Sequence, residues 1–120
     1  MLGWLIIVRR SRLDSDAAGG DVLAKWEAGV GGIDWLDALE VEGKAACLSR
    51  HGYPNRFHVA AQAVLPYLRA EHPPLNDGLE ILGDSYVSPR GWTGPMTVAA
   101  ELVAACAFGE VWTIDAWDQS

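Results

Sequence analysis

Basic residues are scarce in this chain. Nine Lys and Arg stand against sixteen Asp and Glu in 120 residues, which gives a formal net charge of −7 at pH 7. Nucleic-acid-binding surfaces neutralise phosphates with clustered Lys and Arg. The composition therefore argues against direct nucleic-acid binding and favours a protein partner with a basic surface.

The few basic residues are also unevenly distributed. Residues 1–12 hold three arginines and no acid, whereas the rest of the chain holds six basic and sixteen acidic residues, a net charge of −10. Three arginines could bind an anion, but we interpret Arg9, Arg10 and Arg12 as the solvated end of an edge strand, where they block pairing with another strand. The acidic character belongs to the body of the protein.

Cysteines are few, and long apolar runs are missing. Cys47 and Cys106 are the only cysteines, and neither has a spacing that suggests zinc or redox chemistry, so we expect both thiols to be free and buried. The apolar stretch 2–8 is too short to span a bilayer, and arginines follow it where a signal peptide would place them before. We expect a cytoplasmic protein without a membrane partner, a metal or another cofactor.

Catalytic and phosphate-binding motifs are missing as well. No serine lies in a Gly-x-Ser-x-Gly turn. The glycine-rich run 29–32 lacks the Lys-Ser/Thr ending of a phosphate loop, and Asp34 beside it would repel phosphate. These absences favour a protein that binds over one that catalyses.

Three histidines keep one enzymatic hypothesis open. His51, His58 and His72 match no metal-ligand spacing. His51 and His58 flank the turn at 52–55, and together with Asp84 they could line a small pocket. The alternative function is therefore a small hydrolase or nucleotide-processing enzyme that uses His51, His58 and Asp84.

Apolar residues are abundant. Half of the residues are hydrophobic and six are tryptophans, which is enough for a core without disulfides at this length. We expect one compact domain over residues 1–120. Turn-forming residues separate segments of strand and helix character that lack regular strand–helix–strand lengths. This pattern indicates an α+β fold with a mainly antiparallel sheet and about three helices packed on it.

The periodicity predicts where these elements lie. The expected strands are 2–10, 22–27 (with one helical turn as the alternative), a hairpin of 45–48 with 56–60, a short hairpin of 79–82 with 86–87, and a half-buried strand 111–117. The expected helices are 34–43, with Asp34 as N-cap; 61–71, where Pro66 requires a late start or a kink; and 95–106, apolar almost all round and packed on several sides.

The first predicted helix is acidic. Asp34, Asp37 and Glu40 recur every third residue, on a face away from the apolar side of the helix. A metal-binding or catalytic role for these acids is the alternative to a solvated face. With Glu42, we expect them to present negative potential to a basic partner.

Two turns combine an arginine with an aromatic residue, the types most enriched at binding hot spots. Arg90 and Trp92 lie in the loop 87–95, and Tyr53 and Arg56 lie at the turn 52–56. We predict these four residues as anchors for a partner. For Trp92 the alternative is a lid folded over the core.

Several segments together resemble a known group of proteins. They are Asp34-Trp35-Leu36-Asp37 with Gly43-Lys44-Ala45, Gly52-Tyr53-Pro54 with Arg56-Phe57, Gly83-Asp84 with Tyr86-Val87, and the run 116–120. The combination resembles small, acidic, uncharacterised proteins encoded in bacterial phages and prophages. The resemblance implies no activity and no catalytic residue; it implies a small accessory protein, many of which bind and block a host protein.

The sequence thus predicts a non-enzymatic acidic interaction protein. It would block a basic surface of a host protein or of a nucleic-acid-binding defence complex. An immunity protein that neutralises a toxin is a further alternative, because it would offer the same acidic face and aromatic anchors. A homodimer is also open, because the apolar excess can leave a patch that needs cover.

Overall fold

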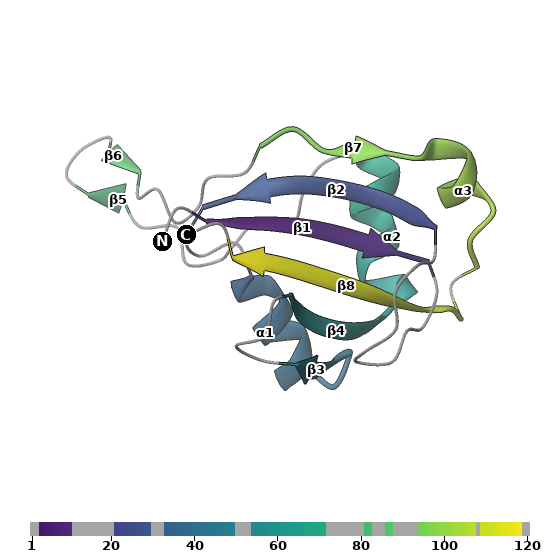
Figure 1. Cartoon of the computed structure of the whole chain (residues 1–120), viewed down its shortest axis with the longest axis horizontal. Helices are drawn as coiled ribbons and strands as arrows, with labels where there is room; N and C mark the ends of the chain where they lie inside the picture. The colour runs from purple at the N-terminus through teal and green to yellow at the C-terminus, as the bar shows by residue number, and fades with distance from the viewer. Residues whose placement is uncertain are drawn as a thin grey trace.

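The computed structural model describes residues 3–10, 21–29, 33–49, 54–71, 81–82, 86–87, 94–107 and 109–118. These residues form one six-stranded antiparallel sheet, a separate two-stranded ladder and three helices (Figure 1), which confirms the predicted α+β fold. The elements in chain order are β1 (Trp4–Arg9), β2 (Val22–Ala28), α1 (Asp34–Val41), β3 (Ala45–Ser49), β4 (Asn55–Ala60), α2 (Ala61–Ala70), β5 (Ile81–Leu82), β6 (Tyr86–Val87), β7 (Thr97–Val98), α3 (Ala100–Ala104) and β8 (Val111–Asp118).

The two strands that are most distant in the sequence pair at the centre of the sheet. The strand order is β3-β4-β8-β1-β2-β7, and β1 pairs with β8 from Trp4↔Asp118 to Arg9↔Thr113. The interpretation of Arg9 as the end of an edge strand is therefore wrong. β1 has a neighbour on each side because both β2 and β8 supply alternating apolar residues that match its buried face.

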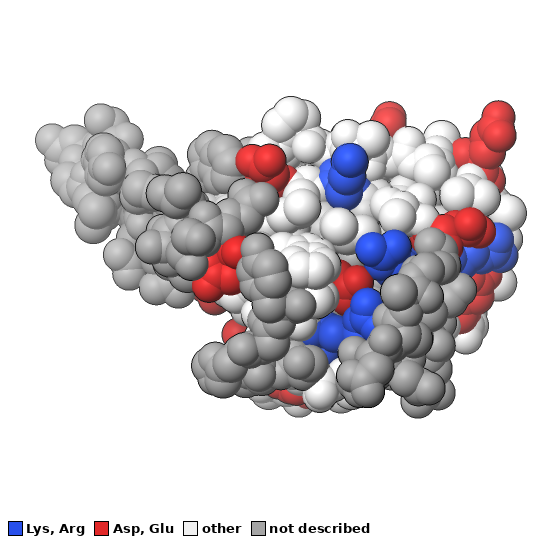
Figure 2. Space-filling view, viewed as in Figure 1, with Lys and Arg blue, Asp and Glu red and all other residues white. Residues whose placement is uncertain are grey.

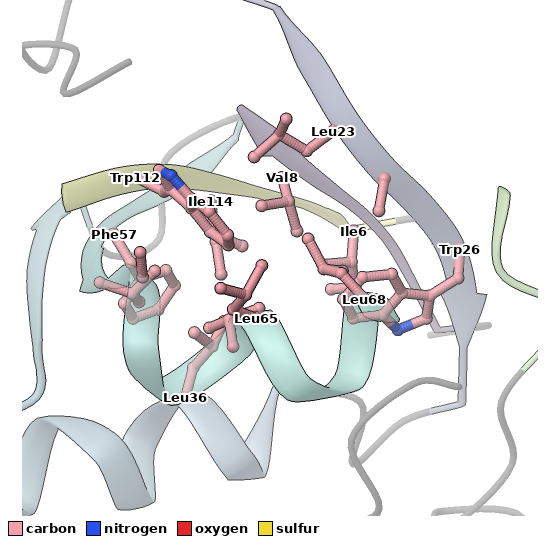
Figure 3. Close-up of a cluster of buried hydrophobic side chains, with 14 of the residues drawn as sticks. Ile6, Val8, Leu23, Trp26, Leu36, Phe57, Leu65, Leu68, Trp112 and Ile114 are labelled. Carbon is pink, nitrogen blue, oxygen red and sulfur yellow. The ribbon is translucent and has the colours of Figure 1, made fainter. Parts of the chain in front are cut away.

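Helix α2 covers one face of the sheet, and it lies behind the strands in Figure 1. The close-up in Figure 3 shows Ile6 and Ile114 of the central strands pointing toward Leu65 and Leu68 of this helix. All four side chains are fully buried or nearly so. The adjacent helix α1 adds Trp35 and Leu36 to the same core; truncation of such a buried leucine to alanine costs about 2–5 kcal/mol.

The first two helices differ from the prediction at single residues. Helix α1 has Ile33 as its N-cap, without a side-chain hydrogen bond. Asp34 is instead the first helical residue, where its carboxylate still faces the positive end of the helix dipole. Helix α2 begins at Ala61 and continues through Pro66, which lies on its exposed side. Water can reach the carbonyl of Gln62, which loses its helical N–H partner there.

The third predicted helix is mostly wrong. Residues 94–99 run alongside β2 as extended chain, where the N–H of Gly94 donates to the carbonyl of Glu27 and the N–H of Ala99 to that of Leu23. Pairing with this otherwise open strand edge outweighs the local helical tendency. The remaining helix α3 has five residues, and only Val103 among them is buried, so it is not packed on several sides.

The short hairpin of β5 and β6 is confirmed as an antiparallel pair. Both cysteines are free; Cys106 is buried and Cys47 is half-buried. In the ranges of the chain that the structure describes, none of the helices combines the length and the apolar character needed to cross a membrane.

Candidate protein-interaction surface

Strand β8 is buried on both of its faces, although its alternating pattern predicts a half-buried strand. Thr113 and Asp115 point away from α2 and are still only 0% and 1% exposed. A buried carboxylate needs a charged partner or several hydrogen bonds. Asp115 has such partners in two arginines.

Arg56 holds Asp115 in a two-point contact. Its Nε donates to Oδ1 of Asp115 at 2.6 Å and its Nη2 to Oδ2 at 3.0 Å, while Nε of Arg9 donates to the same Oδ2 at 3.1 Å. The Arg56 side chain is 8% exposed. In this conformation Arg56 joins β4 to β8 in the interior of the protein. The turn pattern predicts an exposed anchor for a partner, and the structure does not place Arg56 in such a position.

Arg10, which is partly exposed to solvent, also forms an ion pair. Its Nε and Nη2 donate to the two oxygens of Glu110, at 3.0 and 3.2 Å. Glu110 further accepts hydrogen bonds from the backbone N–H of Ala107 and from Nε1 of Trp112. The hydrogen bond from Arg10 makes the largest contribution to lowering the pKa of Glu110, which falls to about 2. This carboxylate ties the end of β1 to the segment between α3 and β8.

The acids of α1 divide between two sides of the helix. Asp34, Asp37, Ala38 and Val41 follow the spacing i, i+3, i+4, i+7, so they form one outward row opposite the buried Trp35 and Leu36. Ala38 and Val41 are exposed, and Asp34 and Asp37 are half-buried. Val41 is 89% exposed, the highest value among the large apolar side chains that the structure describes.

Glu40 turns toward the sheet instead. Its Oε2 accepts a hydrogen bond from the backbone N–H of Cys47 at 3.2 Å. Cys47 lies on β3, the edge strand of the sheet. A side chain that occupies such an N–H hinders another strand from pairing with it. Glu40 therefore protects the sheet edge, in addition to the negative charge that it brings to α1.

Glu42 continues the acidic surface past the end of α1. It is exposed and forms an ion pair with Lys44 at 3.3 Å, in which both side chains are more than half exposed. A pair this exposed is worth little energetically. We call the set Asp34, Asp37, Val41 and Glu42 the acidic stripe.

Of the other predicted site residues, the structure describes only His58. His58 is buried on β4, where it lies opposite Thr113. His51 and Asp84 of the predicted pocket lie outside the described residues, as do Tyr53, Arg90 and Trp92. Among the residues that are described, no three His, Cys, Asp or Glu side chains form a group that could hold a metal ion.

The sheet face opposite α2 carries a second surface, seen in Figure 2. The strand register puts Ile7, Lys25 and Thr97 side by side on this face. They line two adjoining hollows of about 520 and 340 Å³ along β2. We call the two hollows together the trough. No local sequence pattern marks the trough, because it forms only where three strands pair.

The trough has an apolar floor and one cation at its middle. Leu5 and Ile7 lie on the floor, and Pro95 closes one end. Lys25 is exposed and lines both hollows. Glu27 is the one acid among the residues described along the trough, and it lies in the hollow that Pro95 closes.

No protein family model, no curated protein and no solved structure matches this chain.

Proposed function

We propose that this chain is a non-enzymatic, phage-encoded interaction protein that acts in the bacterial cytoplasm. It binds and blocks a basic surface of a host protein, such as a nucleic-acid-binding defence complex. The acidic stripe of α1 makes the contact. Its carboxylates accelerate encounter with a positive surface, and its apolar member slows dissociation.

The exposure of Val41 carries this proposal. A valine gains about 1.5–3 kcal/mol when it is buried, yet 89% of Val41 faces solvent. Asp37 lies one turn before Val41 on the outward row of the helix, and Glu42 follows Val41 at the C-cap. An exposed apolar side chain next to carboxylates suits a partner pocket with a basic rim. The excess of seven negative charges adds long-range attraction to such a partner.

Affinity capture from a bacterial host lysate tests the proposal, with the retained proteins identified by mass spectrometry. Three baits are compared: the unchanged chain, the stripe variant Asp37→Lys with Val41→Asp, and the control Glu101→Lys. Glu101 is an exposed acid on α3, outside the stripe. We expect a basic protein that the unchanged chain and the control retain and that the stripe variant loses.

Salt dependence of the purified complex is the second readout. Added salt screens attraction between exposed charges, so the association rate should fall as the salt concentration rises. A partner that binds the stripe variant as tightly as the unchanged chain would rule out α1 as the contact. A binding constant that is flat from low to high salt would count against charge complementarity.

A further inference from the structure

Two surfaces of this protein complement each other in charge and in apolar character. The acidic stripe presents an exposed apolar side chain, Val41, with Asp37 one turn before it and Glu42 after it. The trough presents an apolar floor with the ammonium group of Lys25 at its middle. The stripe therefore supplies negative charge and an apolar side chain, and the trough supplies a positive charge and an apolar surface to pack against them.

These surfaces cannot meet within one molecule. Helix α1 packs against β3, whereas the trough lies along β2 and β7. The strand order places β3 and β7 at opposite edges of the six-stranded sheet, and Figure 1 shows α1 and β7 on opposite sides of it. A contact between stripe and trough thus requires a second molecule.

We propose that the trough binds the acidic stripe of a second copy of this chain. In this contact Val41 enters the apolar floor beside Ile7, and Asp37 approaches Lys25. Glu27 in one hollow repels carboxylates, so Asp34 and Asp37 lie toward the hollow that lacks it. The location of Lys25 and Glu27 on one strand thereby sets the direction in which the helix lies.

This contact regulates the proposed function. It rests on that function in one respect, because the stripe has to be the surface that binds the host protein. Self-association covers the stripe, so a host protein and a second copy compete for it. The contact joins two different surfaces, so it either closes a symmetric dimer when both copies donate a stripe or extends into chains. The net charge of −7 on each copy opposes the association, which keeps it concentration-dependent.

Sedimentation of the full-length protein over a concentration series tests the contact. The proteins compared are the unchanged chain, Lys25→Glu, Asp37→Lys, the double variant with both changes, and the control Glu101→Lys. We expect each single reversal to raise the dissociation constant about tenfold and the double variant to recover most of that loss, because residues in contact couple energetically. The control should behave as the unchanged chain.

A second variant guards against local effects on α1. Val41→Asp keeps Asp37 and its contacts, and it should also abolish self-association while the far-UV circular dichroism stays unchanged. A chain that is monomeric at every concentration, or a double variant no better than the single reversals, would overturn the inference.

The proposed function fails on a different result. If self-association shows this pattern but no captured host protein depends on the stripe, the inference stands as self-assembly and the inhibitor proposal falls. If a host protein depends on the stripe while the free chain is monomeric, the inhibitor proposal stands and the trough contact falls.

Discussion

Arg56 and Asp115 face each other across β4 and β8 and share two hydrogen bonds, of 2.6 and 3.0 Å, in the interior of the protein. Removal of one member of a buried ion pair leaves the other charge uncompensated and costs about 3–5 kcal/mol. The sequence predicts Arg56 as a binding anchor, but in the structure Arg56 contributes to the stability of the fold.

We predict that Arg56→Met lowers the free energy of unfolding by about 3 kcal/mol. Arg9 still contacts Asp115 in this variant, which keeps the loss at the lower end of the range. Urea denaturation measures it. The double variant Arg56→Met with Asp115→Leu should cost less than the sum of the two single changes. Both charges of the pair are then removed, so neither Arg56 nor Asp115 remains as a buried charge without the other. A loss below about 0.5 kcal/mol, the level of an ordinary surface change, would contradict the structure.

Glu110 predicts a pH dependence. Its pKa in the folded protein is about 2, below the usual 4.5. A depressed carboxyl pKa stabilises the fold above the unfolded pKa, and that stability is lost as the pH falls from about 4.5 toward 2. We expect Glu110→Gln to be less stable than the unchanged chain at pH 6, and the difference to shrink at pH 3.

Urea unfolding at both pH values measures this difference, with Glu101→Gln as the control for an exposed acid outside the cluster. The control should change stability little at either pH. A difference between Glu110→Gln and the unchanged chain that is equal at pH 6 and pH 3 would mean that Arg10 does not hold Glu110 in its charged form.

The tryptophans Trp112 and Trp26 make a matched pair. Both are buried, but Nε1 of Trp112 donates to Glu110 at 3.2 Å, whereas Nε1 of Trp26 has no hydrogen-bond partner. Replacement by phenylalanine removes a similar volume from each site. Trp112→Phe should be more destabilising than Trp26→Phe by about 1.5 kcal/mol, because only Trp112 loses a hydrogen bond to a charged group. Thermal or urea unfolding of the two variants compares them directly, and equal losses would contradict this hydrogen-bond assignment.

The hydrogen bond of Glu40 to the edge strand predicts an effect of its removal on aggregation. Glu40→Ala removes the acceptor for the N–H of Cys47, which should cost about 1 kcal/mol. It should also increase aggregation, because the freed edge can pair with another strand. Light scattering during incubation at high protein concentration measures this, with Glu42→Ala as the control. Faster aggregation of the Glu42 variant would indicate a general charge effect and not edge protection.

Much of the fold follows from local patterns. The hairpin of β3 and β4 flanks a turn that its own residues specify, and β2, α1 and α2 follow from periodicity and turn signals. The acidic character of α1 is visible in the sequence for the same reason. What local spacing does not reveal is that Glu40 contacts Cys47, because β3 has to return beside the helix first.

The sequence by itself determined the class of the fold, the positions of most elements and the acidic character of α1. Only the tertiary structure decided that β1 and β8 pair at the centre, which buries Asp115 between Arg9 and Arg56. It also decided that residues 97–98 form a strand, since the open edge of β2 supplied partners for them. Pairings between distant segments depend on which surfaces meet when the chain collapses, and no local window of sequence contains that information.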